Sequence, residues 1–329
     1  MFIVYALTAF AISFLTTFIS IPRVAIFMKS RGIVGVDVHK LDKPEIPEMV
    51  GISILIGLSI SLAFLSMVIP ESSNTYLAVL LSIVVAAFVG FLDDLKDLSP
   101  ISKILLALLS GFPMIILKTY NPRPIIPFIG KVRLTIVYPL AIPIALSVTT
   151  NTMNMSDPVN GVMSGSASII LMVLTVAYLL TGNYIASLTG LALMGATLAF
   201  YLYNRFPAKV FSGNVGSFAM GAAIGSLVVT GGLEIVAVIA MLPQILNSYM
   251  ILSTGGFKGK KDITVRPTRL LENGLIEAVE DQRAPLTLVR MILAGSAKTE
   301  RKIAREFLAL TAFSSILALI TLLIMPLGG

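Results

Sequence analysis

Three carboxylates close a long apolar run of this sequence, in the stretch GFLDDLKD at residues 90–97. Asp93 and Asp94 directly follow the last apolar side chains, at a depth where a membrane helix would still be leaving lipid. An ionisable group in that position costs about 3 kcal/mol on insertion, so it usually marks a functional site. Carboxylate oxygens suit Mg²⁺ or Mn²⁺, which bind a few carboxylates together with substrate phosphates. The pair therefore predicts a metal and phosphate site, whereas Asp97 is equally well explained as a solvated helix end.

A second polar segment, NTMNMSDPVNG at residues 151–161, separates two apolar runs. Asn154 and Asn160 supply amides and Asp157 a carboxylate, which is a higher density of polar side chains than a turn requires. In FSGNVGS, glycines surround Asn214 at the predicted start of a helix, leaving backbone N–H groups free to meet an anion. Helix capping is the competing explanation for each asparagine, and the two roles are compatible.

Two arginines bracket a proline in VRPTRL, within the longest polar segment of the chain, residues 254–306. Arg266 and Arg269 suit a diphosphate, because the planar guanidinium is bidentate and always charged. Farther along the same segment, PLTLVRMILAG predicts a short amphipathic helix lying in a membrane interface. Charge beside a membrane is the simpler explanation for three neighbouring lysines: Lys258, Lys260 and Lys261.

The elements that must position these groups are membrane helices. Hydrophobic residues make up 56% of the 329 and charged residues 12%, with a mean hydropathy of +0.94, whereas soluble chains carry about 25% charged residues. Runs of the length that spans a bilayer, about 20 residues, recur throughout. We therefore predict an all-α integral membrane protein with about ten transmembrane helices in a single membrane domain, 1–329. The predicted spans are 2–22, 50–70, 75–92, 102–118, 134–150, 163–181, 184–203, 215–231, 233–253 and 307–327.

The distribution of basic residues predicts the orientation. Segments after odd-numbered spans hold twenty of the 24 lysines and arginines, and such an excess is typical of cytoplasmic loops. Both termini are then expected outside a cell membrane, with residues 254–306 as a long cytoplasmic loop. This asymmetry and attraction to anionic head groups account for the net charge of +7, so no nucleic-acid partner is expected.

Missing residue types narrow the chemistry further. The chain has no cysteine and a single histidine, His39, so thiolate catalysis, a histidine zinc cluster and a Ser-His-Asp relay are not expected. The unusual polar segments all fall on the predicted cytoplasmic side, which places the active site in cytoplasmic loops. Carboxylates, amides and cations together indicate metal-assisted phosphoryl transfer, in which the protein mainly positions charge.

Three motifs in this order, GFLDDLKD, NTMNMSDPVNGV and VFSGNVGSFAMGAAIG, resemble the polyprenyl-phosphate N-acetylhexosamine-1-phosphate transferases (glycosyltransferase 4 type) over about residues 30 to 280. The resemblance implies Mg²⁺-dependent transfer of a sugar 1-phosphate from a UDP-N-acetylhexosamine to a dolichyl or polyprenyl phosphate, with release of UMP. It also implies membership of the glycosylation machinery that begins lipid-linked oligosaccharides, and it makes a homodimer plausible.

The sequence is most similar to the archaeal and eukaryotic branch, which makes N-acetylglucosaminyl-diphospho-dolichol. KPEIPEMVGISI resembles the first loop of that branch, YNRFPAKVF its YxxxPxxVF stretch and VRPTRLLENGLIE its sugar loop. Bacterial branches carry a histidine triplet in the sugar loop, and this chain has only His39. Dolichol-type motifs together with Asp157, which resembles the bacterial branches, suggest an archaeal enzyme.

The resemblance also implies roles for individual residues. It places Asp93 and Asp94 at the lipid phosphate near Mg²⁺, Lys103 at the phosphates and Asn154 near the metal. The remaining matches are Asn160 near the uracil, Glu48 toward the nucleoside, and Arg266 and Arg269 near the sugar and diphosphate.

One position departs from the family pattern. The metal-ligating aspartate of the family's GDT or GDS motif is replaced here by Asn214. An amide oxygen can bind Mg²⁺ but brings no charge, so we expect Asp157 to restore it, and we predict Asn154, Asp157 and Asn214 as the metal ligands.

Two other functions would use similar residues. An intramembrane prenyltransferase would use the Asp-rich motif but requires a second acidic motif, and the second site here is rich in asparagine. A transporter of anionic substrates would show internal repeats and charged residues at mid-membrane, neither of which the sequence displays. The choice among acetamido sugars and the length of the lipid acceptor depend on the shapes of a loop and a groove, which no motif encodes.

Overall fold

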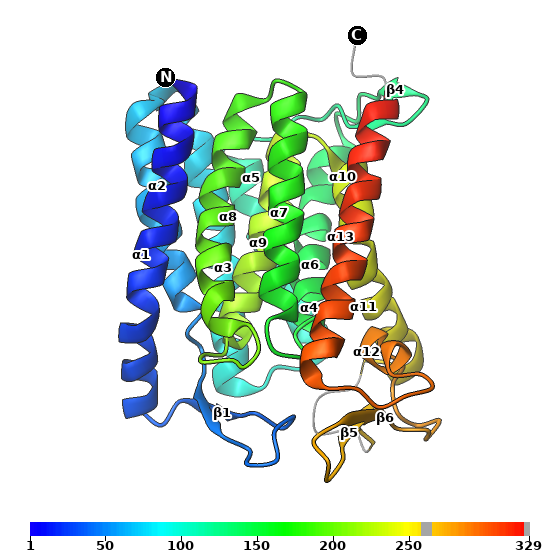
Figure 1. Ribbon diagram of the computed structural model, residues 1–329. Coiled ribbons are helices and arrows are strands. Elements are labelled where there is room, and N and C mark those ends of the chain that lie inside the picture. Colours follow the sequence, from blue (N-terminus) through cyan, green and yellow to red (C-terminus); the bar gives the residue numbers. More distant parts are fainter. Residues whose placement is uncertain (258–264, 326–329) are drawn as a thin grey trace.

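The computed structural model describes residues 1–257 and 265–325, which form a bundle of helices with small hairpins at its ends (Figure 1). Lys258, Lys260 and Lys261 lie outside the described residues, as does the end of the predicted span 307–327. The described part is mostly helical, which confirms the predicted all-α class apart from three two-stranded hairpins.

The long helices are α1 (Phe2–Ser30), α3 (Ser73–Lys96), α6 (Val137–Met155), α7 (Val162–Leu180), α8 (Tyr184–Asn204), α9 (Gly213–Gly231) and α13 (Glu300–Ile324). The shorter ones are α2 (Ile52–Val68), α4 (Pro100–Ala107), α5 (Phe112–Ile116), α10 (Glu234–Ala240), α11 (Leu242–Gly255) and α12 (Leu288–Ile292), with 3₁₀ turns η1 (Pro70–Ser72) and η2 (Leu108–Gly111). The antiparallel hairpins pair β1 (Val34–Val36) with β2 (Glu45–Pro47), β3 (Ile125–Ile126) with β4 (Gly130–Lys131), and β5 (Thr268–Leu270) with β6 (Ile276–Ala278).

Each of the ten predicted spans coincides with helical structure, but not each forms a helix able to cross a membrane. Six helices are long and apolar enough, counting η1 with α3, and the α10–α11 pair, bent by 68°, makes a seventh if it is counted as one span. The range 102–118 is divided among α4, η2 and α5, and α2 has only 17 residues. The second half of α6 is polar. The described chain is a multi-pass membrane protein with six or seven such spans, rather than the ten expected.

Helix α9 lies at the centre of the bundle, packed along α3 and α6. All residues from Val215 to Val229 are buried, which a helix rich in glycine, alanine and serine allows because its neighbours can approach closely. Gly90 of α3 has its Cα against the backbone of Asn214, and Gly221 of α9 lies against the backbone of Thr150 in α6. Gly221 therefore allows close packing of α9 against α6.

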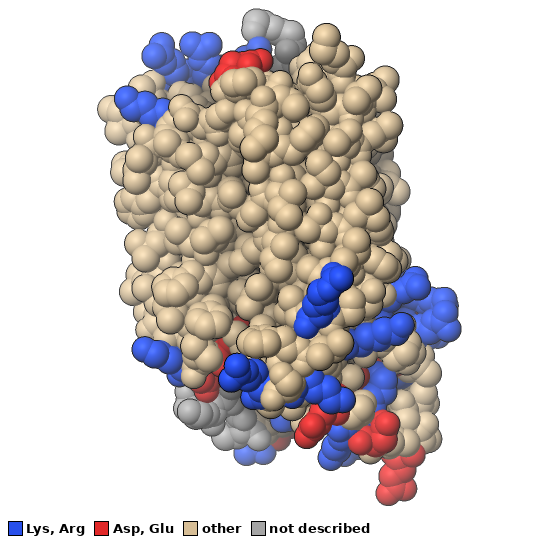
Figure 2. All heavy atoms as spheres, turned by 90° about the vertical axis from the view of Figure 1, so that its left-hand side faces the viewer, with Lys and Arg blue, Asp and Glu red and all other residues tan. Residues whose placement is uncertain are grey.

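Polar structure is concentrated at the two ends of the bundle. Hairpins β1–β2 and β5–β6 and helix α12 share one end, whereas the N-terminus and hairpin β3–β4 lie at the other (Figure 1). Lysines, arginines and acidic residues gather at both ends, and a belt of uncharged residues separates them (Figure 2). Such a belt is what a bilayer requires of the surface it covers.

The predicted amphipathic segment 285–295 contains the five-residue helix α12. Val289 and Leu293 are buried in a small apolar cluster that includes Phe307 of α13 and Ile276 of β6, whereas Met291 is 51% exposed. This cluster attaches the β5–β6 hairpin to α13, and so to the bundle.

We expect Gly221→Leu to destabilise the bundle by about 1–3 kcal/mol. A Cβ at residue 221 would lie 2.5 Å from Thr150 Cα, and backbone cannot yield as a flexible side chain does. The measurement is the melting temperature in detergent, with Val148→Leu as control because Val148 of α6 is 48% exposed. Equal melting temperatures for the two variants would contradict the close α6–α9 contact.

Candidate active site

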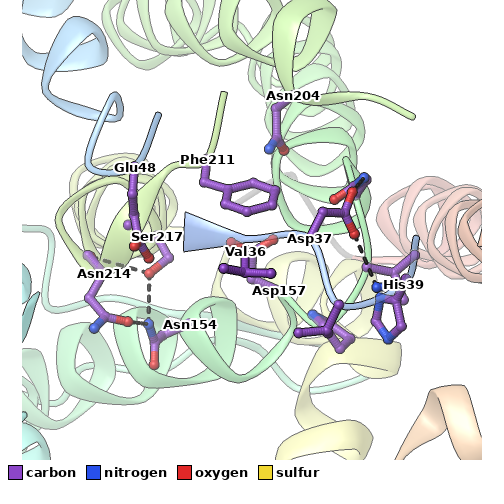
Figure 3. Close-up of a pocket in the computed structure, with 15 residues that line it drawn as sticks. Val36, Asp37, His39, Glu48, Asn154, Asp157, Asn204, Phe211, Asn214 and Ser217 are labelled. Atoms are coloured by element: carbon purple, nitrogen blue, oxygen red, sulfur yellow. Dashed lines mark hydrogen bonds between the residues drawn. The ribbon is translucent and has the colours of Figure 1, made fainter. Parts of the chain in front are cut away.

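A cavity of about 310 Å³ opens at the end of the bundle that carries β1–β2 and β5–β6 (Figure 3). Three segments that are distant in sequence meet there: the loop after α1, the turn between α6 and α7, and the start of α9. Its polar lining is Asp37, His39, Glu48, Asn154, Asp157, Asn160, Asn204, Asn214 and Ser217. Of the predicted site residues, Glu48, Asn154, Asp157, Asn160 and Asn214 are thus brought together.

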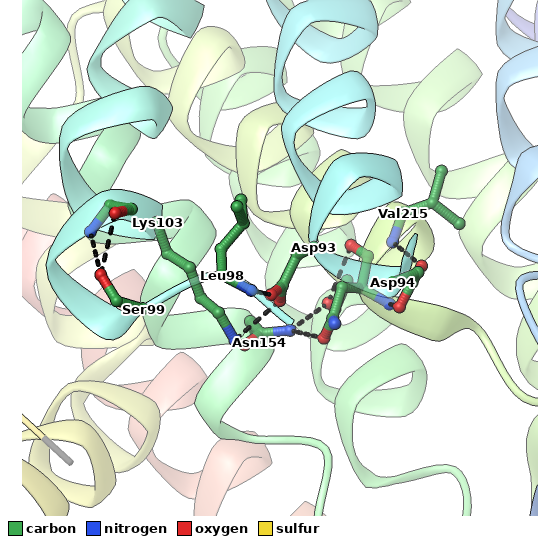
Figure 4. Close-up of polar contacts among 10 residues, drawn as sticks. Asp93, Asp94, Leu98, Ser99, Lys103, Asn154 and Val215 are labelled. Atoms are coloured by element: carbon green, nitrogen blue, oxygen red, sulfur yellow. Dashed lines mark hydrogen bonds and ion pairs between the residues drawn. The ribbon is translucent and has the colours of Figure 1, made fainter. Parts of the chain in front are cut away.

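The carboxylate of Asp94 holds the first turn of α9 (Figure 4). It accepts hydrogen bonds from the backbone N–H groups of Asn214, at 2.8 Å to Oδ1, and Val215, at 3.0 Å to Oδ2. These N–H groups have no partner within the helix, and the positive end of the helix dipole favours a carboxylate there. Gly213 makes the contact possible, since its φ is +64° and a Cβ would lie 2.8 Å from Asp94 Oδ2. Asp94 thereby fixes the position of Asn214.

Asp93 points to the other side of α3 and forms an ion pair with Lys103 of α4 (Figure 4). The two groups are 2.7 Å apart, with side-chain exposures of 1% for Asp93 and 15% for Lys103. Asp93 Oδ1 also accepts the Leu98 N–H at 2.9 Å. Helix α3 ends at Lys96, and Asp97 adopts a left-handed conformation with φ of 50°, so Asp97 does not continue the helical face of Asp93. The chain reverses there, which brings Lys103 back to Asp93.

The amides of Asn154 and Asn214 face each other between the end of α6 and the start of α9. Asn154 Nδ2 donates to Asn214 Oδ1 at 2.7 Å and to Ser217 Oγ at 2.8 Å. Ser217 lies one turn into α9, in the quoted motif, but its hydroxyl was not predicted as a site group. The hydrogen bonds occupy the Asn214 oxygen and leave Asn154 Oδ1 without a hydrogen-bond donor among the described residues.

Asp157 lies in the turn between α6 and α7 and is attached to the residue that precedes α9, because the Ser212 hydroxyl donates to its Oδ2 at 2.9 Å. Although the residue is exposed, the protein atoms around its carboxylate displace water and raise its pKa to about 6, against the opposing effect of Ser212; nearby Glu48 contributes further. Gly35 leaves room for Glu48, because a Cβ there would lie 3.1 Å from Glu48 Oε2. The carboxylates of Asp157 and Glu48 therefore lie near each other and repel each other until a cation or a proton neutralises one of them.

Asn160 is held by two buried carboxylates that the sequence did not reveal. Its Nδ2 donates to Asp37 Oδ2 at 2.9 Å, and its backbone N–H donates to Glu300 Oε1 at 3.1 Å. Lys40 pairs with both acids, at 3.2 Å from Asp37. Glu300 is 140 residues away and follows the capping residue Thr299, so its sequence context indicated only a helix start. Asp37 could have been suspected from the polar loop that contains His39.

The cluster of Asp37, His39 and Glu300 has the spacing of a metal site, yet the Lys40 ammonium pairs with both carboxylates and offsets one of their two negative charges, so a metal ion would have to compete with Lys40. Burial lowers the pKa of His39, against the opposing effect of Glu300 and Asp37, so the imidazole is neutral at neutral pH.

The two predicted arginines occupy different places. Arg266 has the smallest effect among the charged groups that shift the pKa of the His39 imidazole, which it lowers, and it does not line the cavity. Arg269 lies on β5, where it pairs with Glu277 of β6 and is 69% exposed, and it does not line the cavity.

The donor set of the cavity suits a divalent cation with oxygen ligands. Asp157 and Glu48 supply charge, and Asn154 Oδ1 supplies a neutral oxygen without a competing donor among the described residues. Hard oxygens of this kind favour Mg²⁺ or Mn²⁺ over Zn²⁺. Asn214 could join only if its amide turned away from Asn154.

Comparison with known proteins shows the family of the chain. Residues 76–232, from α3 to the end of α9, match glycosyl transferase family 4. A protein of Saccharolobus solfataricus, provisionally named UDP-N-acetylglucosamine–dolichyl-phosphate N-acetylglucosaminephosphotransferase, is 34% identical over 77% of this chain and 78% of its own length. A protein of Sulfolobus acidocaldarius with the same name is 30% identical over 75% and 77%.

A phospho-N-acetylmuramoyl-pentapeptide-transferase of Clostridium botulinum is 29% identical over 63% of this chain and 69% of its own length. The resemblance inferred from the three motifs is confirmed, and so is the predicted similarity to archaeal members of the family. The chain belongs to glycosyl transferase family 4.

Proposed function

We propose that this protein transfers N-acetylglucosamine 1-phosphate, or a related acetamido sugar 1-phosphate, from a UDP-sugar to a dolichyl or polyprenyl phosphate and releases UMP. The observation that carries the proposal is the cavity in which Asp157, Glu48 and Asn154 converge beside the α9 turn held by Asp94. The names of the two archaeal relatives support this donor and acceptor. The reaction would begin the assembly of lipid-linked oligosaccharides.

The cavity would face the cytoplasm from a cell membrane. The end of the bundle with the cavity carries the β1–β2 and β5–β6 hairpins (Figure 1), which belong to segments rich in lysine and arginine. The positive-inside rule favours that end on the cytoplasmic side, with both termini outside. In this arrangement α2, α6 and the α4–α5 segment would add three crossings to the seven candidate spans and complete the ten.

Mg²⁺, with Mn²⁺ as an alternative, would be held by Asp157 and Asn154, joined by Asn214 after a turn of its amide. When bound, the ion would neutralise the diphosphate and the developing charge on the leaving UMP. Glu48 lies near enough to Asp157 to raise its pKa, so it adds negative charge that strengthens cation binding.

The transfer exchanges one bond to phosphorus for another. An oxygen of the lipid phosphate attacks the phosphorus that carries the sugar, and the bond from this phosphorus to the bridging oxygen breaks, so that UMP leaves with that oxygen. The protein's task is to hold the two phosphates in line. Lys103, which pairs with Asp93 at 2.7 Å, would contact the acceptor phosphate, and Arg266 would contact the diphosphate.

Asp94 would act as a positioning residue. Both of its oxygens accept backbone hydrogen bonds from α9, which occupies them and fixes the cavity wall formed by Asn214 and Ser217. Asn160 would contact the nucleoside, and Asp37 and Glu300 orient it.

We expect Asp94→Asn to lower UMP release by at least about 100-fold, and to lower the melting temperature, because the amide would turn its NH2 donor toward one of the two backbone N–H groups and leave that group without an acceptor. UMP release would be measured with UDP-N-acetylglucosamine, dolichyl phosphate and Mg²⁺ in detergent. Asp42→Asn is the control, since Asp42 is exposed on the same side of the bundle. UMP formed without lipid, or full activity of Asp94→Asn, would refute the proposal.

A cation held by Asp157 predicts that two substitutions change the Mg²⁺ requirement in opposite directions. Asp157→Asn removes charge and should raise the Mg²⁺ concentration for half-maximal activity by about tenfold or more, whereas Asn214→Asp adds charge and should lower it. A carboxylate at 214 can still accept the Asn154 hydrogen bond. Unchanged Mg²⁺ dependence in both variants would show that the ion binds elsewhere.

The same site predicts a pH dependence. Burial raises the pKa of Asp157 to about 6, so the carboxylate takes up a proton as pH falls through that value and loses its attraction for Mg²⁺. The half-saturating Mg²⁺ concentration should rise below pH 6 in the wild type and vary less in Asp157→Asn. Parallel pH profiles for the two proteins would contradict the assignment.

A further inference from the structure

A second cavity, of about 430 Å³, lies between the end of α8 and the start of α13, at the same end of the bundle as the candidate active site. Four basic side chains line it: Arg205, Lys209, Arg301 and Arg305. Its other lining residues include Phe206 and Pro207 from the α8–α9 loop.

These four cations have no acidic partner among the residues that the structure describes. Across residues 1–257 and 265–325, none of the four forms an ion pair. The two acids that hold Asn160, which also lines this cavity, are Asp37 and Glu300, and both are paired with Lys40. Cations that line one concave surface without counter-charges repel each other and create a positive potential focused in the hollow. This surface should therefore attract an anionic ligand.

An apolar groove of about 180 Å³ continues from the basic cavity along the helices. The two share Tyr201 and Leu308 as lining residues. The rest of the groove is formed by α7 and α8, with Ile169, Met172, Met194 and Leu198. Since α7, α8 and α13 are apolar helices long enough to cross a membrane, the groove faces the region that lipid chains occupy. A soluble anion would use only the first half of this composite site.

We propose that the site binds an anionic phospholipid of the membrane, with its phosphate among Arg205, Lys209, Arg301 and Arg305 and one chain in the groove. Basic pockets between membrane helices bind anionic head groups in this way, each cation contributing to the attraction. The site is separate from the acceptor's phosphate position, because no residue of α3 or α4 lines either half, whereas Asp93 and Lys103 belong to those helices.

The test uses the full chain, stripped of lipid in detergent. Phosphatidylglycerol, phosphatidylcholine or inorganic phosphate is titrated in while the melting temperature is followed, and native mass spectrometry counts the lipid retained. We expect phosphatidylglycerol to stabilise the wild type more than phosphatidylcholine, and phosphate alone to have no effect. Arg205→Gln combined with Arg305→Gln should require about tenfold or more phosphatidylglycerol for the same shift.

Lys302→Gln is the matched control, because Lys302 is an exposed cation of α13 outside the cavity; it should behave as the wild type. Ser168→Phe fills the groove and should weaken phosphatidylglycerol binding while leaving phosphate without effect. The proposal is overturned if phosphate alone reproduces the shift, or if the double variant and the wild type respond equally. It is also overturned if the double variant loses affinity for dolichyl phosphate but not for phosphatidylglycerol.

Discussion

The contact between Asp94 and the first turn of α9 is the interaction on which the rest of the site depends. Helix α9 enters the centre of the bundle with its N-terminal N–H groups facing the charged end, and Asp94 is the only α3 side chain that the hydrogen bonds among described residues place on them. The contact requires Gly90 and Gly213, because a Cβ at either would collide with the backbone of Asn214 or with the carboxylate itself. One ion-dipole contact thus determines the α3–α9 distance and the place of Asn214. The paired aspartates are thereby divided: Asp94 supports the architecture, and Asp93 holds the cation Lys103.

The second constraint is the distribution of charge around the cavity. With an asparagine at 214, the wall formed by α9 carries no charge, and its amide is engaged with Asn154. Negative charge comes instead from Asp157 and Glu48 on the facing segments, where burial raises the pKa of Asp157 to about 6. A carboxylate at residue 157 in place of one at residue 214 preserves the total charge available to a cation. The departure from the family motif is therefore compatible with metal-dependent transfer.

Both ligand surfaces described above meet at the turn between α6 and α7. Asn160 lines the central cavity and the basic cavity, and Gly161 with φ of +77° lets this turn pack against the backbone of Arg205. Asp37 and Glu300 hold the same asparagine from the loop after α1 and from α13. The turn thus joins elements from both ends of the chain, and their hydrogen bonds hold Asn160 in the lining of the cavity.

The sequence by itself determined the membrane class, the helical ranges and five residues of the cavity, because apolar length and clustered polar side chains are local properties of a chain. It also indicated the family, since three ordered motifs carry that information. Tertiary structure alone decided the network of Asp37, Lys40 and Glu300, whose members lie 260 residues apart and individually resemble loop and helix-start residues. It likewise showed that Arg266 does not line the cavity, that Arg269 pairs with Glu277 and that α3 ends before Asp97. The physical reason is that hydrogen bonds and ion pairs between distant segments depend on how helices pack, and a period of apolar residues specifies which face is buried but not which partner covers it.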